Sequence, residues 1–231
     1  MKHCIIITGY IEGSIRAICP EAFNPISAED PALPLILCAD GGYRLASKEG
    51  LIPHVIIGDF DTFDGMQEDQ PEVRSEAEIR GEILRVPVEK DDTDTLLCIK
   101  YALEQGCDHF TIVGGLGGRL DHTFANLQSL AYLTALGKDA VLKDEETCVM
   151  IKAPGNHVLH RQDDRRPYRR FSLFSWSPAV EGLSIRDAKY ELENGRLEHT
   201  YPLGVSNEFL HEEVHLAFEE GLLLIIQNHL R

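Results

Sequence analysis

Short apolar runs recur through the first 146 residues, and polar or glycine-rich sequence follows each of them. Continuous apolar runs of this length are typical of strands that are covered on both faces. Longer segments with helical spacing lie between the runs, so the alternation predicts a parallel sheet with helices on both faces, a three-layer α/β domain. The predicted strands are Cys4–Thr8, Leu35–Ala39, His54–Ile57, Ile83–Val86, Phe110–Val113 and Ala140–Leu142.

Two helices are predicted most clearly between these strands. The first runs from Asp94 to Gln105, and Gly106 ends it. A polar residue just before it caps its start, with Asp91, Asp92 and Thr93 as the candidates. The second runs from Leu120 to Leu136, where apolar residues at helical spacing are Leu120, Phe124, Leu127 and Ala131.

The pattern changes after Glu146. Strand-like runs then follow one another with turns between them and no helix pattern, which predicts an antiparallel β-sandwich. We therefore predict an α/β domain over residues 1–146 and a β-sandwich domain over residues 147–231. The strands expected in the second domain are Cys148–Ile151, His157–His160, Phe171–Phe174, Leu183–Ile185, Val214–Ala217 and Leu222–Ile226.

Charge and cysteine usage narrow the class of protein. The formal net charge of −16 over 231 residues is unsuited to nucleic acid and to anionic membranes. An arginine-rich stretch, 161–170, also contains aspartates and a proline, and it is interpreted as a solvated loop. Six cysteines without a CxxC pair, three of them in apolar runs, indicate free buried thiols. With no signal-like or membrane-spanning apolar segment, we expect a cytoplasmic protein.

Carboxylates follow two of the predicted strands. Asp40, Gly41 and Gly42 follow the strand 35–39, and Asp59 and Asp61 follow the strand 54–57. Ligands of parallel α/β sheets bind beyond these carboxyl ends, and residues two apart in extended chain point to the same side. Asp59 and Asp61 can thus share one cation. A surface turn is the alternative, but two like charges on one side of a strand end cost energy unless a cation is present, which favours the metal site. Asp40 is alternatively a helix N-cap.

Two further motifs fit the same chemistry. Asp91 and Asp94 share one face if a helix starts near Asp92, although capping alone explains any single one of these aspartates. The glycine-rich segment Gly114–Gly118 lies between a predicted strand and a predicted helix, and Arg119 follows it. The backbone amides of the segment and the Arg119 guanidinium can therefore hold phosphates. The spacing fits neither a P-loop nor a dinucleotide-binding fingerprint. Asp121 and His122 follow directly; His122 alone is as well explained by a structural role. The residues alone predict a magnesium-nucleotide phosphoryl-transfer enzyme and nothing more specific.

Five segments together resemble the thiamin pyrophosphokinase (thiamine diphosphokinase) family in its bacterial form. They occur in the family's order and are Ala39–Gly42, Gly58–Asp61, Lys90–Asp94, Gly118–His122 with Asn126, and Gly204–Glu208. Each segment is weakly specific alone, and by spacing alone Gly204–Glu208 predicts only a turn. The five in order are specific.

The resemblance implies a reaction, an assembly and a set of site residues. It implies Mg²⁺-dependent transfer of the diphosphate of ATP to thiamine, with release of AMP, in a homodimer whose active sites lie at the subunit interface. Asp59, Asp61 and Asp94 would hold the metal, and Asp61, Asp94, Arg119 and Asp121 would be catalytic. ATP would be bound by Asp40, Gly41, Gly42, Gly115, Gly118, Arg119 and His122. Thiamine would be bound by Asp91, Ser206 and Asn207, the last two from the partner subunit, with Trp176 or Phe209 as aromatic candidates.

Two other functions remain open at this stage. A Mg²⁺-dependent phosphohydrolase or nucleotidyltransferase would use the same aspartates but has no need of Ser206 and Asn207. A non-catalytic thiamine or nucleotide sensor would keep the scaffold, but the unbroken acidic motifs speak against it.

Overall fold

The computed structural model describes residues 1–23, 33–59, 81–87, 89, 91–161 and 167–229. The chain divides into two compact units. The first comprises Met1–Ser129 and Lys138–Glu145, and the second comprises Leu130–Gly137 and Glu146–Arg231. The predicted fold class, an α/β domain followed by an antiparallel β-sandwich, is confirmed.

The first unit is built on a parallel sheet in the order β6-β5-β1-β2-β3-β4. Each of the six predicted strands is present, with ends that differ by at most one residue. In register, Cys4 of β1 lies between Leu35 of β2 and Phe110 of β5. The strands are β1 (His3–Ile7), β2 (Leu35–Ala39), β3 (Val55–Gly58), β4 (Glu82–Arg85), β5 (His109–Val113) and β6 (Asp139–Lys143).

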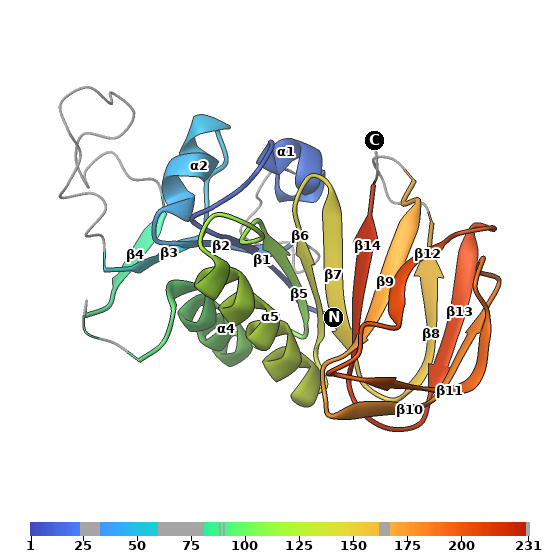
Figure 1. Ribbon diagram of the computed structural model, residues 1–231. Coiled ribbons are helices and arrows are strands. Elements are labelled where there is room, and N and C mark those ends of the chain that lie inside the picture. The colour runs from blue at the N-terminus through green and yellow to red at the C-terminus, as the bar shows by residue number, and fades with distance from the viewer. Residues whose placement is uncertain (24–32, 60–80, 88, 90, 162–166, 230–231) are drawn as a thin grey trace. The chain divides into compact units, whose positions relative to one another are not determined.

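Helices cover both faces of this sheet (Figure 1). α1 (Ile15–Ile18), the 3-10 turn η1 (Pro20–Phe23) and α2 (Gly42–Lys48) lie on one face, and α4 (Asp94–Glu104) and α5 (Leu120–Ala135) lie on the other. Alternate strand residues such as Ile5, Ile7 and Cys38 pack with α1 and α2 in one fully buried cluster. This double cover explains why the strands are continuously apolar.

Helix α1 is short and starts without a side-chain bond from its own N-cap, Ser14. Glu49, just after α2, takes that role. Its carboxylate accepts from the amides of Ile15 and Arg16 at 2.7 and 2.9 Å and from the Ser14 hydroxyl at 2.8 Å. Burial acts to raise the pKa of Glu49, but these hydrogen bonds outweigh it and lower the pKa overall. The Glu49 carboxylate thereby fixes the end of the loop between β1 and α1.

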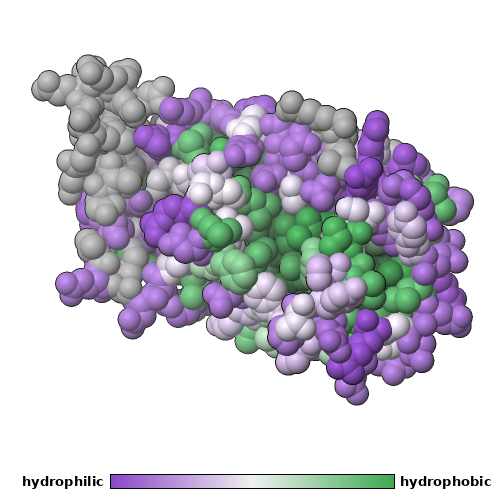
Figure 2. Space-filling model, viewed as in Figure 1, coloured by the Kyte–Doolittle hydropathy of each residue, from purple (hydrophilic) through white to green (hydrophobic). Residues whose placement is uncertain are grey.

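Helix α5 matches its predicted bounds, but its apolar stripe is not its buried face. Leu120 is 76% exposed and Phe124 is 56% exposed, whereas Leu130 and Leu133 are fully buried. Asn126 and Ser129 join the buried side. Figure 2 shows hydrophobic surface in the region of α5, in the view of Figure 1. The helical spacing therefore predicts the helix correctly, but it does not show which side of the helix is buried.

The second unit consists of two antiparallel sheets, in the orders β12-β9-β14-β7 and β11-β10-β13-β8. Two of its strands were not predicted, β11 and β12, and the turn expected at Gly204–Glu208 is wrong because this segment is β12. The strands are β7 (Thr147–Lys152), β8 (Gly155–His160), β9 (Arg170–Ser175), β10 (Ala179–Arg186), β11 (Leu192–Glu198), β12 (Gly204–Glu208), β13 (Glu213–Phe218) and β14 (Leu223–Asn228).

All six cysteines are free and buried, as predicted. Within the described part of the chain, no helix has the length and apolar character needed to cross a bilayer. Residues 162–166, half of the arginine-rich stretch, lie outside the described residues.

Candidate active site

A cavity of about 680 Å³ opens in the first unit where the strands of the parallel sheet end. Its volume falls in the range of small-molecule sites, roughly 300–1,000 Å³. Residues that follow β1, β2, β3 and β5 meet there with the first turns of α4 and α5. The lining residues are Thr8, Gly9, Tyr10, Ala39, Asp40, Gly41, Asp59, Thr93, Asp94, Thr95, Gly115, Gly117, Gly118, Arg119, His122, Ala125 and Asn126.

Three carboxylates predicted from separate motifs line this one cavity: Asp40, Asp59 and Asp94. Asp40 has a left-handed backbone, with φ of 37°, and its amide donates to the carbonyl of Ile57 on the neighbouring strand at 2.9 Å. The alternative that Asp40 is the N-cap of α2 is wrong, because the cap residue is Gly41. Asp61, the other predicted metal ligand after β3, lies outside the described residues.

At the start of α4, different residues cap the helix and line the cavity. Thr93 is the N-cap, and its hydroxyl accepts from the amide of Leu96 at 3.2 Å. Asp92 pairs with Lys100. Asp94 therefore is not required for the cap, and it lines the cavity. Asp91 is exposed and is not among the lining residues, so the structure does not bring this predicted thiamine ligand to the cavity.

The glycine-rich loop has a backbone that only glycine adopts easily. Gly114, Gly115, Gly117 and Gly118 all have positive φ, from 63° to 102°. Three of their amides are already hydrogen-bonded within the protein. Gly114 donates to the carbonyl of Lys143 at 2.7 Å, Gly115 donates to that of Tyr10 at 2.7 Å, and Gly117 donates to the Thr123 hydroxyl at 3.1 Å. These three amides shape the wall of the cavity and are not available to phosphates.

Gly115 and its neighbours are held from a second side by Asn126. This residue is buried in α5, and its amide nitrogen donates to the carbonyl of Gly115 at 3.0 Å. A Cβ atom on Gly115 would lie 2.3 Å from that nitrogen. Gly42, by contrast, does not line the cavity. A Cβ atom there would lie 2.3 Å from the carbonyl oxygen of Ile7, so Gly42 allows α2 to pack closely on β1.

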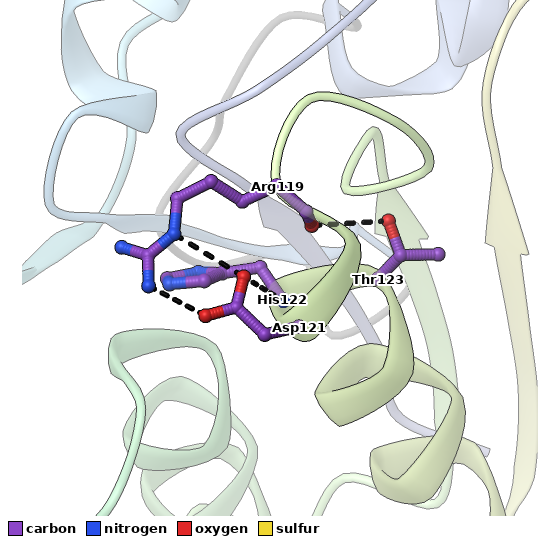
Figure 3. Close-up of polar contacts among 4 residues, drawn as sticks. All are labelled: Arg119, Asp121, His122 and Thr123. Atoms are coloured by element: carbon purple, nitrogen blue, oxygen red, sulfur yellow. Dashed lines mark hydrogen bonds and ion pairs between the residues drawn. The ribbon is translucent and has the colours of Figure 1, made fainter.

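Arg119 and Asp121 form a two-pronged ion pair at the start of α5 (Figure 3). Nε donates to Oδ1 at 3.2 Å, and Nη2 donates to Oδ2 at 2.6 Å. This contact raises the pKa of Arg119 and lowers the pKa of Asp121, whose Oδ1 also accepts from the amide of His122 at 3.0 Å. Arg119 and His122 line the cavity, whereas Asp121 does not. A guanidinium has five N–H donors, so Asp121 orients the group and leaves donors for a phosphate.

The sequence did not single out the residues that follow β1. Thr8, Gly9 and Tyr10 all line the cavity. The only available signal was their position after the strand Cys4–Thr8, where a glycine follows the apolar run as it does after β2. No charged side chain marks this segment, so the pattern of carboxylates could not reveal it.

In the second unit, Asn207 and Ser206 have different surroundings. Asn207 is buried, and its amide nitrogen and oxygen bond to the carbonyl and amide of Tyr190 at 2.8 and 3.0 Å. Ser206 has φ of 63°, and its amide donates to the Ser172 hydroxyl. Asn207 also lines an apolar cavity of about 310 Å³. Phe209, an aromatic candidate for thiamine, is 7% exposed and packs edge-on against Phe171, so it is a buried residue of the second unit.

The donors of the larger cavity suit a hard cation together with phosphates. Carboxylate oxygens are the ligands that Mg²⁺ prefers, and one or two of them suffice when phosphate oxygens and water complete the octahedron. Among the described residues, no group of three or more Asp, Glu, His or Cys side chains is placed to hold a metal ion unaided. Asp59 and Asp94 with a bound triphosphate fit this requirement.

Comparison with known proteins agrees with this chemistry. Residues 31–142 match the family described as the catalytic domain of thiamin pyrophosphokinase, and residues 156–223 match its vitamin B1 binding domain. The chain is 29% identical to the thiamine pyrophosphokinase of Bacillus subtilis over 190 residues, 82% of this chain and 85% of that protein. A thiamin pyrophosphokinase family protein from Enterococcus faecalis superposes with a TM-score of 0.76 at 26% identity over the whole of both chains. The crystal structure of the Bacillus subtilis protein shares the fold, with a TM-score of 0.76 at 24% identity over 98% of this chain and 99% of that one.

Proposed function

The chain belongs to the thiamin pyrophosphokinase family, and we propose that it makes thiamine diphosphate and AMP from ATP and thiamine in the cavity of its first unit. The observation that carries the assignment to this cavity is that Asp40, Asp59 and Asp94 line it together with Arg119. Anionic triphosphate in an acidic cavity requires a cation and a guanidinium, and the residues present match both.

We assign metal binding to Asp59 and Asp94, with Mg²⁺ as the ion, and Asp61 is proposed as a third ligand. The bound ion would offset the negative charge of the β- and γ-phosphates. Asp40 and Gly41 would lie against the nucleotide, because both border the cavity at the end of β2. Gly115 and Gly118 would shape the cavity wall against the nucleotide, and His122 would contact the nucleotide from the first turn of α5.

The chemistry left to the protein is mostly positioning. The hydroxyethyl oxygen of thiamine attacks the β-phosphorus of ATP, a new O–P bond forms, and the bond to the α-phosphate oxygen breaks to release AMP. Arg119 donates to the phosphate oxygens as charge develops on them, and Asp121 holds the guanidinium in place. Asp94 lines the cavity and is our candidate to accept the proton of the alcohol, which typically contributes ~10²–10⁴-fold.

We further propose that two copies of the chain form each complete site, as the family resemblance implies. Exposed apolar side chains of α5, among them Leu120 and Phe124, border the segment that carries Arg119 and His122. Apolar surface of this kind is typical of protein interfaces. Thiamine would contact Ser206 of the partner subunit, while Asn207, whose amide is bonded to Tyr190, would act by holding the Ser206 segment. Asp91 does not line the cavity, so we assign it no contact there. The six free cysteines favour a cytoplasmic location.

The decisive experiment is AMP formation from Mg-ATP with and without thiamine, followed by chromatography. AMP that appears only with thiamine, in equal amount to thiamine diphosphate, is the expected result. Release of ADP or AMP without thiamine would replace this function with a phosphohydrolase or nucleotidyltransferase at the same cavity. Binding of thiamine or ATP without turnover would indicate a sensor.

A further inference from the structure

Tyr10 lies at the edge of the cavity but belongs to none of the motifs that identify the family. It follows β1, lines the cavity, and is 39% exposed. Its ring lies over the glycine-rich loop. A Cβ atom on Gly118 would be 2.8 Å from Cδ2 of the ring, and one on Gly117 would be 3.1 Å from Cε1. The ring therefore occupies the space that side chains at both glycines would take.

The main chain of Tyr10 is fixed to the same loop. Its carbonyl accepts from the amide of Gly115 at 2.7 Å and from the Thr8 hydroxyl at 3.1 Å. The Thr8 hydroxyl also lies 2.9 Å from the carbonyl of Val113, at the end of β5. Tyr10 is thus attached to two adjacent strand ends, and its ring is carried on a rigid base.

The hydroxyl of Tyr10 bonds to Glu12, and a backbone contact with Gly118 partly offsets the effect of Glu12 on the pKa of Tyr10. The hydroxyl donates to Oε1 of Glu12 at 2.6 Å, and this bond is the main reason that the pKa of Tyr10 is raised. The phenol stays protonated at neutral pH. Glu12 Oε1 itself would lie 3.6 Å from a Cβ atom on Gly117, so ring and carboxylate together border one side of the loop.

We propose that Tyr10 is a positioning residue for nucleotide binding, whose ring fixes the Gly117–Gly118 segment and thereby the direction in which Arg119 enters the cavity. The proposal rests on the proposed function in one respect, that the phosphates of ATP bind beside Arg119. Gly117 and Gly118 have no side chains to limit their backbone freedom, and the packed ring supplies that limit. A loop fixed before the ligand arrives loses less conformational entropy on binding.

The test compares Tyr10→Ala and Tyr10→Phe with Tyr101→Ala, a control at a half-buried tyrosine of α4 outside the cavity. Affinity for Mg-ATP is measured by calorimetry, and kcat and both KM values are measured by AMP formation. Tyr10→Ala should weaken Mg-ATP binding and raise the KM for ATP by about tenfold or more, since small displacements at a phosphate site are costly. The KM for thiamine should not change. Tyr10→Phe should restore both values to within about twofold.

Three results would overturn the proposal. The first is wild-type Mg-ATP affinity in Tyr10→Ala. The second is an equal loss in Tyr10→Phe, which would assign the effect to the bond with Glu12. The third is an equal loss in the KM values for ATP and thiamine. If Tyr10→Ala does not fold, Gly118→Ala replaces it, because its Cβ atom would push the ring away; unchanged Mg-ATP affinity there would also contradict the proposal.

The calorimetric readout separates this proposal from the proposed function. A wild-type protein that binds Mg-ATP but forms no thiamine-dependent AMP would overturn the diphosphate transfer, and the Tyr10 variants would still be ranked by their affinity. A wild-type protein that does not bind Mg-ATP would overturn both.

Discussion

A Cβ atom on Gly58 would lie 2.8 Å from both Cβ and Oδ1 of Asp40. Gly58 ends β3 and Asp40 follows β2, so the bare backbone of one strand end makes the room in which the carboxylate of the next strand end lies. This contact joins two motifs that are separate in the sequence. It also explains why a glycine precedes Asp59, independently of any turn.

Gly58→Ala should displace Asp40 and weaken Mg-ATP binding by about tenfold or more, because the methyl group meets both the side chain and the backbone of Asp40. Calorimetric titration with Mg-ATP measures the effect. Gly50→Ala is the control, since it has φ of 74° and nothing within 4 Å, so it strains the backbone without changing the cavity. Equal affinities in wild type and Gly58→Ala would show that the position of Asp40 does not matter for the nucleotide.

Asp94→Asn should lower kcat by about 10²-fold or more while the free energy of unfolding changes by less than about 1 kcal/mol. Stability is preserved because Thr93, not Asp94, caps α4. Asp92→Asn, which removes the surface partner of Lys100, is the control and should retain turnover. Steady-state kinetics at saturating Mg²⁺ with chemical denaturation measures both quantities. Near-normal turnover in Asp94→Asn would remove Asp94 from the metal site and from proton transfer.

Arg119→Lys should raise the KM for ATP or lower kcat by about 10- to 100-fold, although the charge is kept. An ammonium group cannot reproduce the two parallel bonds to Asp121 and still present a planar edge to phosphate. Arg196→Lys is the matched control, because Arg196 is also exposed and paired with carboxylates, those of Glu181 and Glu198 in the second unit. Unchanged ATP kinetics in Arg119→Lys would mean that phosphate binding depends only on the positive charge at position 119 and not on the planar guanidinium.

Acid should destabilise the first unit through His3. Burial lowers the pKa of His3 from 6.5 to about 4; neighbouring His109 and Lys143 add to this and Glu21 opposes it. The unfolded chain therefore takes up the proton first as the pH falls, so the stability contributed by neutral His3 is complete above about pH 6.5 and is lost between 6.5 and 4. Denaturation midpoints across this range measure the loss.

His3→Gln provides the comparison, because glutamine does not titrate and can bond to Thr111 as His3 does at 2.9 Å. Its stability should depend less on pH between 6.5 and 4 than that of the wild type. His199→Gln, at an exposed histidine of the second unit, should follow the wild-type curve. Parallel curves for the wild type and His3→Gln would exclude His3 as the cause.

The sequence predicted most clearly the elements whose burial is uniform. The strands β1, β2, β3 and β5 are buried along almost their whole length, so their apolar runs were unambiguous. β11 and β12 each end a sheet, and their largely exposed residues carry no alternating pattern. Leu120 and Phe124 have helical spacing but lie on the exposed side of α5. A period shows that a helix forms, but it does not distinguish a face that meets the sheet from one left at the surface.

The residues of the candidate site were also predicted only in part. Asp40, Asp59 and Asp94 could be placed together because parallel strands bring their carboxyl ends to one edge. The use of the glycine amides could not be predicted in this way. Whether Gly115 offers its amide to a ligand depends on where the carbonyl of Tyr10 lies, and this is set by the path of the loop after β1. That path has no periodicity and carries no motif, so only the folded chain reveals it.

The central place of β1 affects how the cavity can form during folding. β1 precedes both of its neighbours, which are β2 and, much later in the chain, β5, which begins at His109. The carbonyl of Tyr10 cannot meet the amide of Gly115 before that pairing exists. Closing so large a loop is slow, because chain entropy is lost before the contacts that offset it are made. A chain growing on the ribosome would thus carry β1 without its β5 partner until more than half of the first unit had emerged, and nucleotide binding would report that the pairing of β1 with β5 is complete.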